Sequence, residues 1–171
     1  MTRSILALSL LLAISGLVGC KGEQADAQKE AVAEAPLVAP TGTDDASWKQ
    51  YLQQVVARNQ SGVTDRVYPY YLPANSGTPD DADPEKRSQY DRQLENVAAV
   101  VGRTVLPGNM LAFGSPDSTK MADLIVAAFE GAKMDALKGS QVLFIGHAAD
   151  NDRVKAAVEA VGARYVFVEV K

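Results

Sequence analysis

Apolar residues recur at a helical spacing where the folded part of the sequence begins. They share one helical face: Trp48, Tyr51, Leu52, Val55 and Val56. This spacing, with neighbours three and four residues apart, is typical of a helix that buries one side. Ser47 comes directly before the stripe and is predicted to be its N-cap. The pattern therefore predicts a helix that starts at Ser47 and ends near Asn59.

A second helical stripe follows a polar, acidic loop over residues 77–84. The loop closes with Asp83-Pro84, a residue pair typical of an N-cap followed by proline at the first helical position. The apolar side chains that follow share one face: Tyr90, Leu94, Val97, Ala98 and Val101. The sequence predicts a helix from Asp83 to about Val101, which Gly102 ends.

The last third of the chain alternates short apolar runs with amphipathic stretches. The runs cover residues 109–113, 141–145 and 165–170, and helices are predicted to start near Ser115 and at an Asp150 N-cap. Near-continuous apolar strands separated by amphipathic helices favour parallel pairing under a cover of helices. The sequence thus predicts an α/β domain, with a small three-stranded parallel β-α-β-α-β sheet and the two preceding helices packed on it.

An aromatic segment separates the two predicted N-terminal helices. It reads Tyr68-Pro69-Tyr70-Tyr71-Leu72-Pro73, and its two prolines favour an extended conformation over a helix. Tyrosine is enriched in the cores of protein interfaces. Tyr68, Tyr70 and Tyr71 are therefore either a buried connector or an exposed strip that binds a protein partner, and both readings stay open.

The N-terminus has the pattern of an export signal. Arg3 precedes an apolar run over residues 5–14, which is shorter than the roughly 20 residues of a membrane-spanning helix and matches a signal-peptide core. Leu17-Val18-Gly19-Cys20 then resembles the lipobox of bacterial lipoproteins. The resemblance implies that residues 1–19 are a signal peptide and that Cys20 carries a diacylglyceryl group and a further fatty acid such as palmitate.

The residues after Cys20 are expected to place and extend the protein. By resemblance to enterobacterial lipoproteins, Lys21 in place of the aspartate that marks inner-membrane retention implies the periplasmic face of the outer membrane. The stretch up to Ala46 has no aromatic residue and is rich in alanine and charged side chains, so it is predicted to be a flexible tether. The expected organisation is a signal peptide at 1–19, a lipidated cysteine and tether at 20–46, and one α/β periplasmic domain at 47–171.

Composition narrows the classes of function. The chain has 17 basic and 21 acidic residues and a net charge of −4. This acidity, without a basic stripe, argues against a nucleic-acid partner. Cys20 is the only cysteine and His147 the only histidine, so we expect no disulfide and no metal site. The phosphate-binding glycine motifs are absent, so no cofactor is expected.

Two loops, residues 114–119 and 146–151, are candidates for a ligand site. Both follow predicted strands at the carboxyl end, where α/β sheets bind ligands, and both open a helix whose free N–H groups favour anions. The candidate ligand-binding residues are Ser115, Ser118, Thr119, His147 and Asp150. Helix capping alone explains the same residue types, and Asp117 would repel an anion.

The same residues limit catalysis. A triad would need Ser115 or Ser118 with His147, and Asp150 is the candidate for its third member. Ser115 precedes a proline, however, and no G-x-S-x-G elbow is present. The sequence therefore favours a protein without catalytic residues.

The run Val142-Leu143-Phe144-Ile145-Gly146-His147, followed by Asp150 and a helix, resembles the strand that ends in Gly-His in OmpA-like peptidoglycan-binding domains. The resemblance implies a periplasmic, cell-wall-binding α/β domain. In that family an aspartate after Gly-His and a helical arginine hold the diaminopimelate of the peptide stem. Here Asp150 comes one residue too late and Arg153 too early, so no binding residue is carried over.

Together these patterns predict an envelope-anchored protein with a non-enzymatic binding role. Its partners would be the lipid bilayer, through acylated Cys20, and a periplasmic protein, for which it acts as an assembly accessory or an inhibitor. The alternatives are a peptidoglycan-binding lipoprotein and a hydrolase at the loops around Ser115 and His147.

Overall fold

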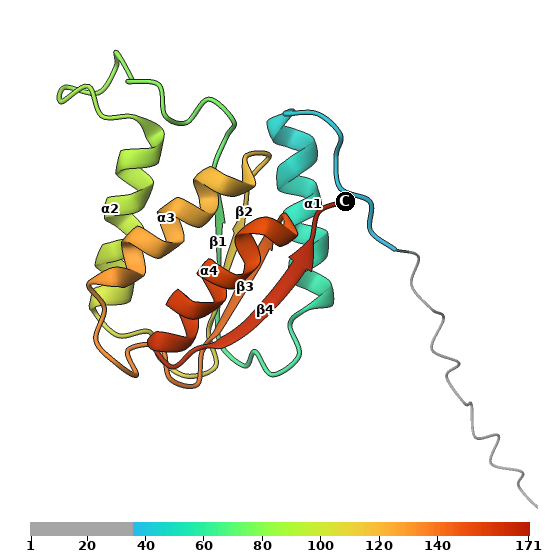
Figure 1. Ribbon diagram of the computed structural model, residues 1–171, viewed down its shortest axis with the longest axis vertical. Coiled ribbons are helices and arrows are strands. Elements are labelled where there is room, and N and C mark those ends of the chain that lie inside the picture. Colours follow the sequence, from blue (N-terminus) through green and yellow to red (C-terminus); the bar gives the residue numbers. More distant parts are fainter. Residues whose placement is uncertain (1–35) are drawn as a thin grey trace, which may run out of the picture. The chain divides into compact units, whose positions relative to one another are not determined.

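The computed structural model describes residues 36–171. The predicted signal peptide, Cys20 and residues 21–35 of the predicted tether lie outside the described residues. Helices and strands alternate along the described chain (Figure 1), in the order α1 (Asp45–Arg58), β1 (Val67–Tyr71), α2 (Gln89–Gly102), β2 (Met110–Gly114), α3 (Ser118–Glu130), β3 (Gln141–Gly146), α4 (Ala148–Ala160) and β4 (Arg164–Glu169). Within residues 36–171, no helix has the length and apolar character needed to cross a membrane.

The strands form one parallel sheet in the order β1-β2-β3-β4. The predicted α/β class and parallel pairing are confirmed, but the prediction of three strands is wrong. The aromatic segment is a fourth strand, β1, at the edge of the sheet. The two N-terminal helices do pack on the sheet, but on opposite faces.

Pro69 fits inside β1 because of the direction in which its backbone points. Met110 donates its N–H to the carbonyl of Arg66 at 2.8 Å, and Leu72 donates its own N–H to Gly114 at 3.2 Å. Backbone groups of alternate residues point to opposite sides of a strand, so even-numbered residues face β2 and Pro69 faces outward. A proline at an outward position of an edge strand removes no bond of the sheet.

The sheet separates two cores. Helices α2, α3 and α4 cover one face, and α1 covers the other (Figure 1). Side chains of β2 alternate between the faces, because successive residues of a strand point to opposite sides. Leu111 and Phe113 join the core under α2–α4, whereas Met110 and Ala112 join the core under α1.

The N-terminal caps of α1 and α2 differ from the predicted ones. Asp44, not Ser47, caps α1, and its carboxylate accepts the N–H of Ser47 at 2.8 Å. Ser88, not Asp83, caps α2 through a reciprocal capping box with Asp91. In both regions several residues of capping type stand close together in the sequence, so residue type alone does not identify the cap.

Residues next to α1 that were assigned to the tether also pack on the domain. Leu37 and Ala39 lie half-buried against the core under α1, while Val38 points outward. The indole N–H of Trp48 donates to the carbonyl of Gly42 at 2.6 Å. The ordered structure therefore begins before Ser47.

Candidate functional site

The two candidate loops meet at the carboxyl edge of the sheet. β2 pairs with β3, and this places the first turns of α3 and α4 side by side. The hydroxyl of Ser118 donates to Asp150 Oδ2 at 2.7 Å and accepts the N–H of His147 at 2.8 Å. Thr119 Oγ1 also donates to Asp150 Oδ2, at 3.3 Å.

Arg153 completes this cluster from the second turn of α4. Its Nη2 and Nε donate to Asp150 Oδ1 at 2.7 and 3.1 Å, and Nη2 also donates to the carbonyl of Thr119 at 3.0 Å. Its Nη1 pairs with Asp123 of α3. The guanidinium therefore joins α3 to α4.

The carboxylate of Asp150 is held in its ionised form. Burial alone would raise the pKa of Asp150, but the hydrogen bonds from Ser118, Arg153 and Thr119 and the charge of Arg153 outweigh it, so the pKa lies below its usual value. Asp150 is not the predicted N-cap of α4. His147 takes that position without a side-chain bond, and Asp150 lies in the first turn.

These contacts leave the carboxyl edge poorly suited to an anion. The oxygens of Asp150 already accept bonds from three side chains, and their charge would repel a second anion. The neighbouring Asp117 caps α3 by accepting the N–H of Lys120 at 3.0 Å, and its other oxygen lies 3.3 Å from Lys120 Nζ. The geometry favours helix capping over ligand binding for these residues.

Ser115 lies apart from this cluster. It is buried, donates to the carbonyl of Leu72 at 2.7 Å and accepts the N–H of Asp117 at 3.0 Å. The ring of His147 is exposed, with Nδ1 3.2 Å from the carbonyl of Val170. Among residues 36–171, no hydrogen bond joins a serine hydroxyl to this ring, so the geometry gives no support to a triad.

Gly146 has a packing role beside His147. A Cβ at Gly146 would lie 2.3 Å from Phe144 Cζ and 2.6 Å from Ser118 Oγ, both too close for any side chain. The glycine of the Gly-His pair thus has a structural cause within this fold. In addition, Asp150 and Arg153 bind each other, so neither is free in the way that recognition of diaminopimelate would require.

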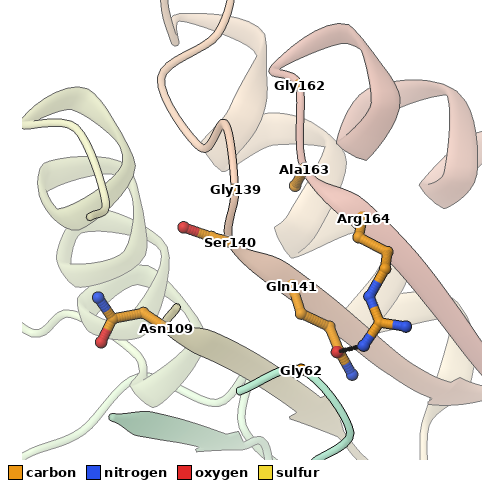
Figure 2. Close-up of a pocket in the computed structure, with 8 residues that line it drawn as sticks. All are labelled: Gly62, Asn109, Gly139, Ser140, Gln141, Gly162, Ala163 and Arg164. Carbon is orange, nitrogen blue, oxygen red and sulfur yellow. Dashed lines mark hydrogen bonds between the residues drawn. The ribbon is translucent and has the colours of Figure 1, made fainter. Parts of the chain in front are cut away.

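The amino edge of the sheet carries a polar hollow of about 360 Å³, which the sequence did not predict (Figure 2). Polar residues lie at the amino ends of three neighbouring strands: Asn109 directly before β2, Gln141 at the start of β3 and Arg164 at the start of β4. Arg164 bonds to the side chain of Gln141 and the carbonyl of Ser61. Gln141 in turn donates to the carbonyl of Asn59 at 2.9 Å. These bonds fix the turn after α1 to the sheet. The signal in the sequence for this hollow was the polar residue at the amino end of each apolar run.

The three tyrosines of β1 have different environments. Tyr70 stacks on the buried Phe113, with ring centroids 4.9 Å apart. Tyr71 lies on the opposite face, and its hydroxyl donates to Asp45 at 2.8 Å. Burial and this bond raise the pKa of Tyr71. Tyr68 is the most exposed of the three, with 37% of its surface exposed.

Tyr68 lines a second hollow, of about 370 Å³, between β1 and the end of α2. Leu106, which is 66% exposed, lines the same hollow together with Val100. Asp65 and Arg66 contribute charged side chains to its wall. We call this site the Tyr68–Leu106 hollow. Leu106 was missed because a single leucine before a Pro-Gly turn belongs to no periodic pattern.

Within the described part of the chain, no group of three or more His, Cys, Asp or Glu side chains is placed to hold a metal ion. Comparison with models of known families, with curated proteins and with solved structures finds no match for this chain.

Proposed function

We propose that this chain is a lipid-anchored protein of the outer membrane that faces the periplasm and binds another envelope protein without catalysing a reaction. The anchor rests on the Leu17-Val18-Gly19-Cys20 lipobox. The binding role rests chiefly on one observation: Tyr68 and Leu106, two exposed apolar side chains far apart in sequence, line one hollow.

The chemistry of this hollow suits a protein partner. Exposed apolar side chains gathered around a depression, with polar groups at its rim, are typical of protein-binding sites. Tyrosine supplies a large contact area and loses little conformational entropy on binding, and a hydroxyl at its tip can still reach water. A partner would insert an apolar side chain between Tyr68 and Leu106, and Arg66 and Asp65 would contact polar groups around it.

The open backbone edge of β1 favours recognition by side chains rather than by an added strand. Pro69 faces outward in the middle of this edge and has no N–H to donate. A partner strand would therefore lack a bond at the centre of the ladder. The affinity would come from the hollow itself.

The anchor can be tested by metabolic labelling with radioactive palmitate. The full-length chain is expected to incorporate label and to fractionate with outer membranes, whereas Cys20→Ser incorporates none. Labelling of the Cys20→Ser variant, or none in the wild-type chain, would contradict the lipid anchor.

The binding role can be tested by chemical cross-linking in intact envelopes followed by purification of the full-length chain. We expect an envelope protein to be enriched with the wild-type chain and lost with the Tyr68→Ala/Leu106→Ala double variant. Val38→Ala is the matched control, because Val38 is 83% exposed and lies beside α1 on the other face of the sheet. Equal recovery with the double variant would overturn the proposed site.

A further inference from the structure

The second edge of the sheet, β4, is open and unprotected. Arg164 donates its N–H to Ser140 at 2.9 Å, and Val170 donates to Gly146 at 2.8 Å, so the even-numbered residues of this strand face β3. The backbone groups of Tyr165, Phe167 and Glu169 therefore point outward. No backbone hydrogen bond from elsewhere in residues 36–171 reaches these three residues.

The two edges of the sheet differ in their protection. β1 carries Pro69 at an outward position, whereas β4 has no proline, and apolar residues fill the centre of the strand. Natural proteins usually blunt an exposed edge with proline, charge or a covering segment, because free N–H and C=O groups pair readily with another strand. β4 carries its two charges only at its ends, Arg164 and Glu169, so its centre has no such protection and is open to a partner strand.

Both faces of β4 also lack full cover. Val166 and Val168 are half-buried on the face of α1, and that helix packs against β1 and β2 rather than β4. Tyr165 and Phe167 are half-buried on the face of α4. An added strand would therefore bury apolar surface on both sides as well as satisfying the backbone.

We propose that the occupant of this edge is β4 of a second copy of the chain, paired antiparallel about a two-fold axis at Phe167. A two-fold axis makes one surface serve both partners. In this register Phe167 lies opposite Phe167 of the second copy, in a hydrogen-bonded pair. Val166 faces Val168 of the second copy in a non-hydrogen-bonded pair, where side chains approach most closely. The result is one continuous sheet across two copies.

The charges of β4 fit this self-pairing. Arg164 faces Val170 of the second copy, and Glu169 faces Tyr165, so no like charges oppose each other. Like charges directly opposite one another would destabilise the pair. In this register the strand therefore pairs with a second copy of itself without charge repulsion and with its apolar residues at the centre.

The pairing is tested by disulfide formation in the full chain carrying Cys20→Ser, so that introduced cysteines are the only thiols. Chains with Val166→Cys and chains with Val168→Cys are produced together and oxidised. We expect several-fold more disulfide-linked dimer from the mixture than from either variant alone, because only residues 166 and 168 face each other. Equal or negligible cross-linking in all three samples would overturn the proposal.

A second test is the oligomeric state of the full chain in detergent, measured as its protein mass by sedimentation. The wild-type chain and Glu169→Ala are expected to be dimers, and Glu169→Pro a monomer. The outward N–H of Glu169 plays no part in the bonds to β3, so proline there spares the sheet. A monomeric wild-type chain, or a dimeric proline variant, would contradict the pairing. These variants leave Tyr68 and Leu106 intact, so this proposal and the proposed binding role stand or fall separately.

Discussion

The hydroxyl of Ser118 lies 2.7 Å from Oδ2 of Asp150 and joins the first turn of α3 to the first turn of α4. The same hydroxyl accepts the N–H of His147, so it also fixes the end of β3. This contact explains why the loops at the carboxyl edge of the sheet are polar. Their polar groups serve one another and the helix starts, and the open apolar surfaces lie elsewhere.

Removal of the Asp150 charge is expected to destabilise the domain. In Asp150→Asn an amide NH2 group, which is a donor, replaces one of the two carboxylate oxygens. The oxygen lost is either Oδ2, which accepts from Ser118 and Thr119, or Oδ1, which accepts from Arg153. We expect the free energy of unfolding at pH 7 to fall by about 1–3 kcal/mol, measured by urea denaturation. Asp152→Asn, at an exposed position two residues along α4, should change it by less than about 0.5 kcal/mol. Similar losses for both variants would contradict the role of Asp150.

The same carboxylate predicts how stability depends on pH. Because the pKa of Asp150 is lowered in the folded state, its contribution is present above the unfolded value of about 4 and is lost as pH falls through the folded pKa. The stability difference between wild type and Asp150→Asn should therefore shrink as the pH is lowered from 7 toward 3. Urea denaturation at a series of pH values measures this. A stability difference between the two proteins that grows on acidification would contradict a lowered pKa of Asp150 in the folded state.

Gly146 is expected to tolerate no side chain. In Gly146→Ala the new methyl group would overlap Phe144 and Ser118, and such overpacking costs about 1–3 kcal/mol. Gly102→Ala is the matched control, since a Cβ there meets nothing within 4 Å at the end of α2. That change should be neutral or stabilise by up to about 1 kcal/mol. Thermal unfolding of the two variants compares them directly.

The tyrosines of β1 should separate into structural and surface residues. Tyr70→Ala removes a ring stacked on Phe113, and we expect it to lower the free energy of unfolding by about 3 kcal/mol. Tyr68→Ala removes a ring that is 37% exposed and lines a surface hollow, so it should lower this free energy by at most about 1 kcal/mol. Equal losses would mean that Tyr68 is part of the core and unsuitable as a binding residue.

Much of the fold could be predicted because its strands and helices have strong periodic patterns. The apolar runs before Gly114 and Gly146 and the stripes between them led to parallel strands under helices. β1 was missed because a proline inside a strand usually argues against it, and only the direction of its backbone makes Pro69 acceptable. That direction depends on the register with β2, which local sequence does not contain.

The candidate site could be predicted only in part. The meeting of Ser118, Thr119, His147 and Asp150 follows from adjacent strands, and the structure brings these four together. The bonds from Arg153 to Asp150 and to the carbonyl of Thr119 depend on how α3 packs against α4, which residue types alone do not reveal. The Tyr68–Leu106 hollow joins residues from β1 and the end of α2, so it exists only in the folded chain.

Site-specific photo-cross-linking in living cells tests the binding role most directly. A photoreactive residue is placed at position 106 of the full-length chain, within the Tyr68–Leu106 hollow, or at position 38 as a control of similar exposure. Illumination is expected to join position 106, but not position 38, to one envelope protein, and Tyr68→Ala is expected to abolish this product. No product at position 106, or the same product from both positions, would contradict the binding role.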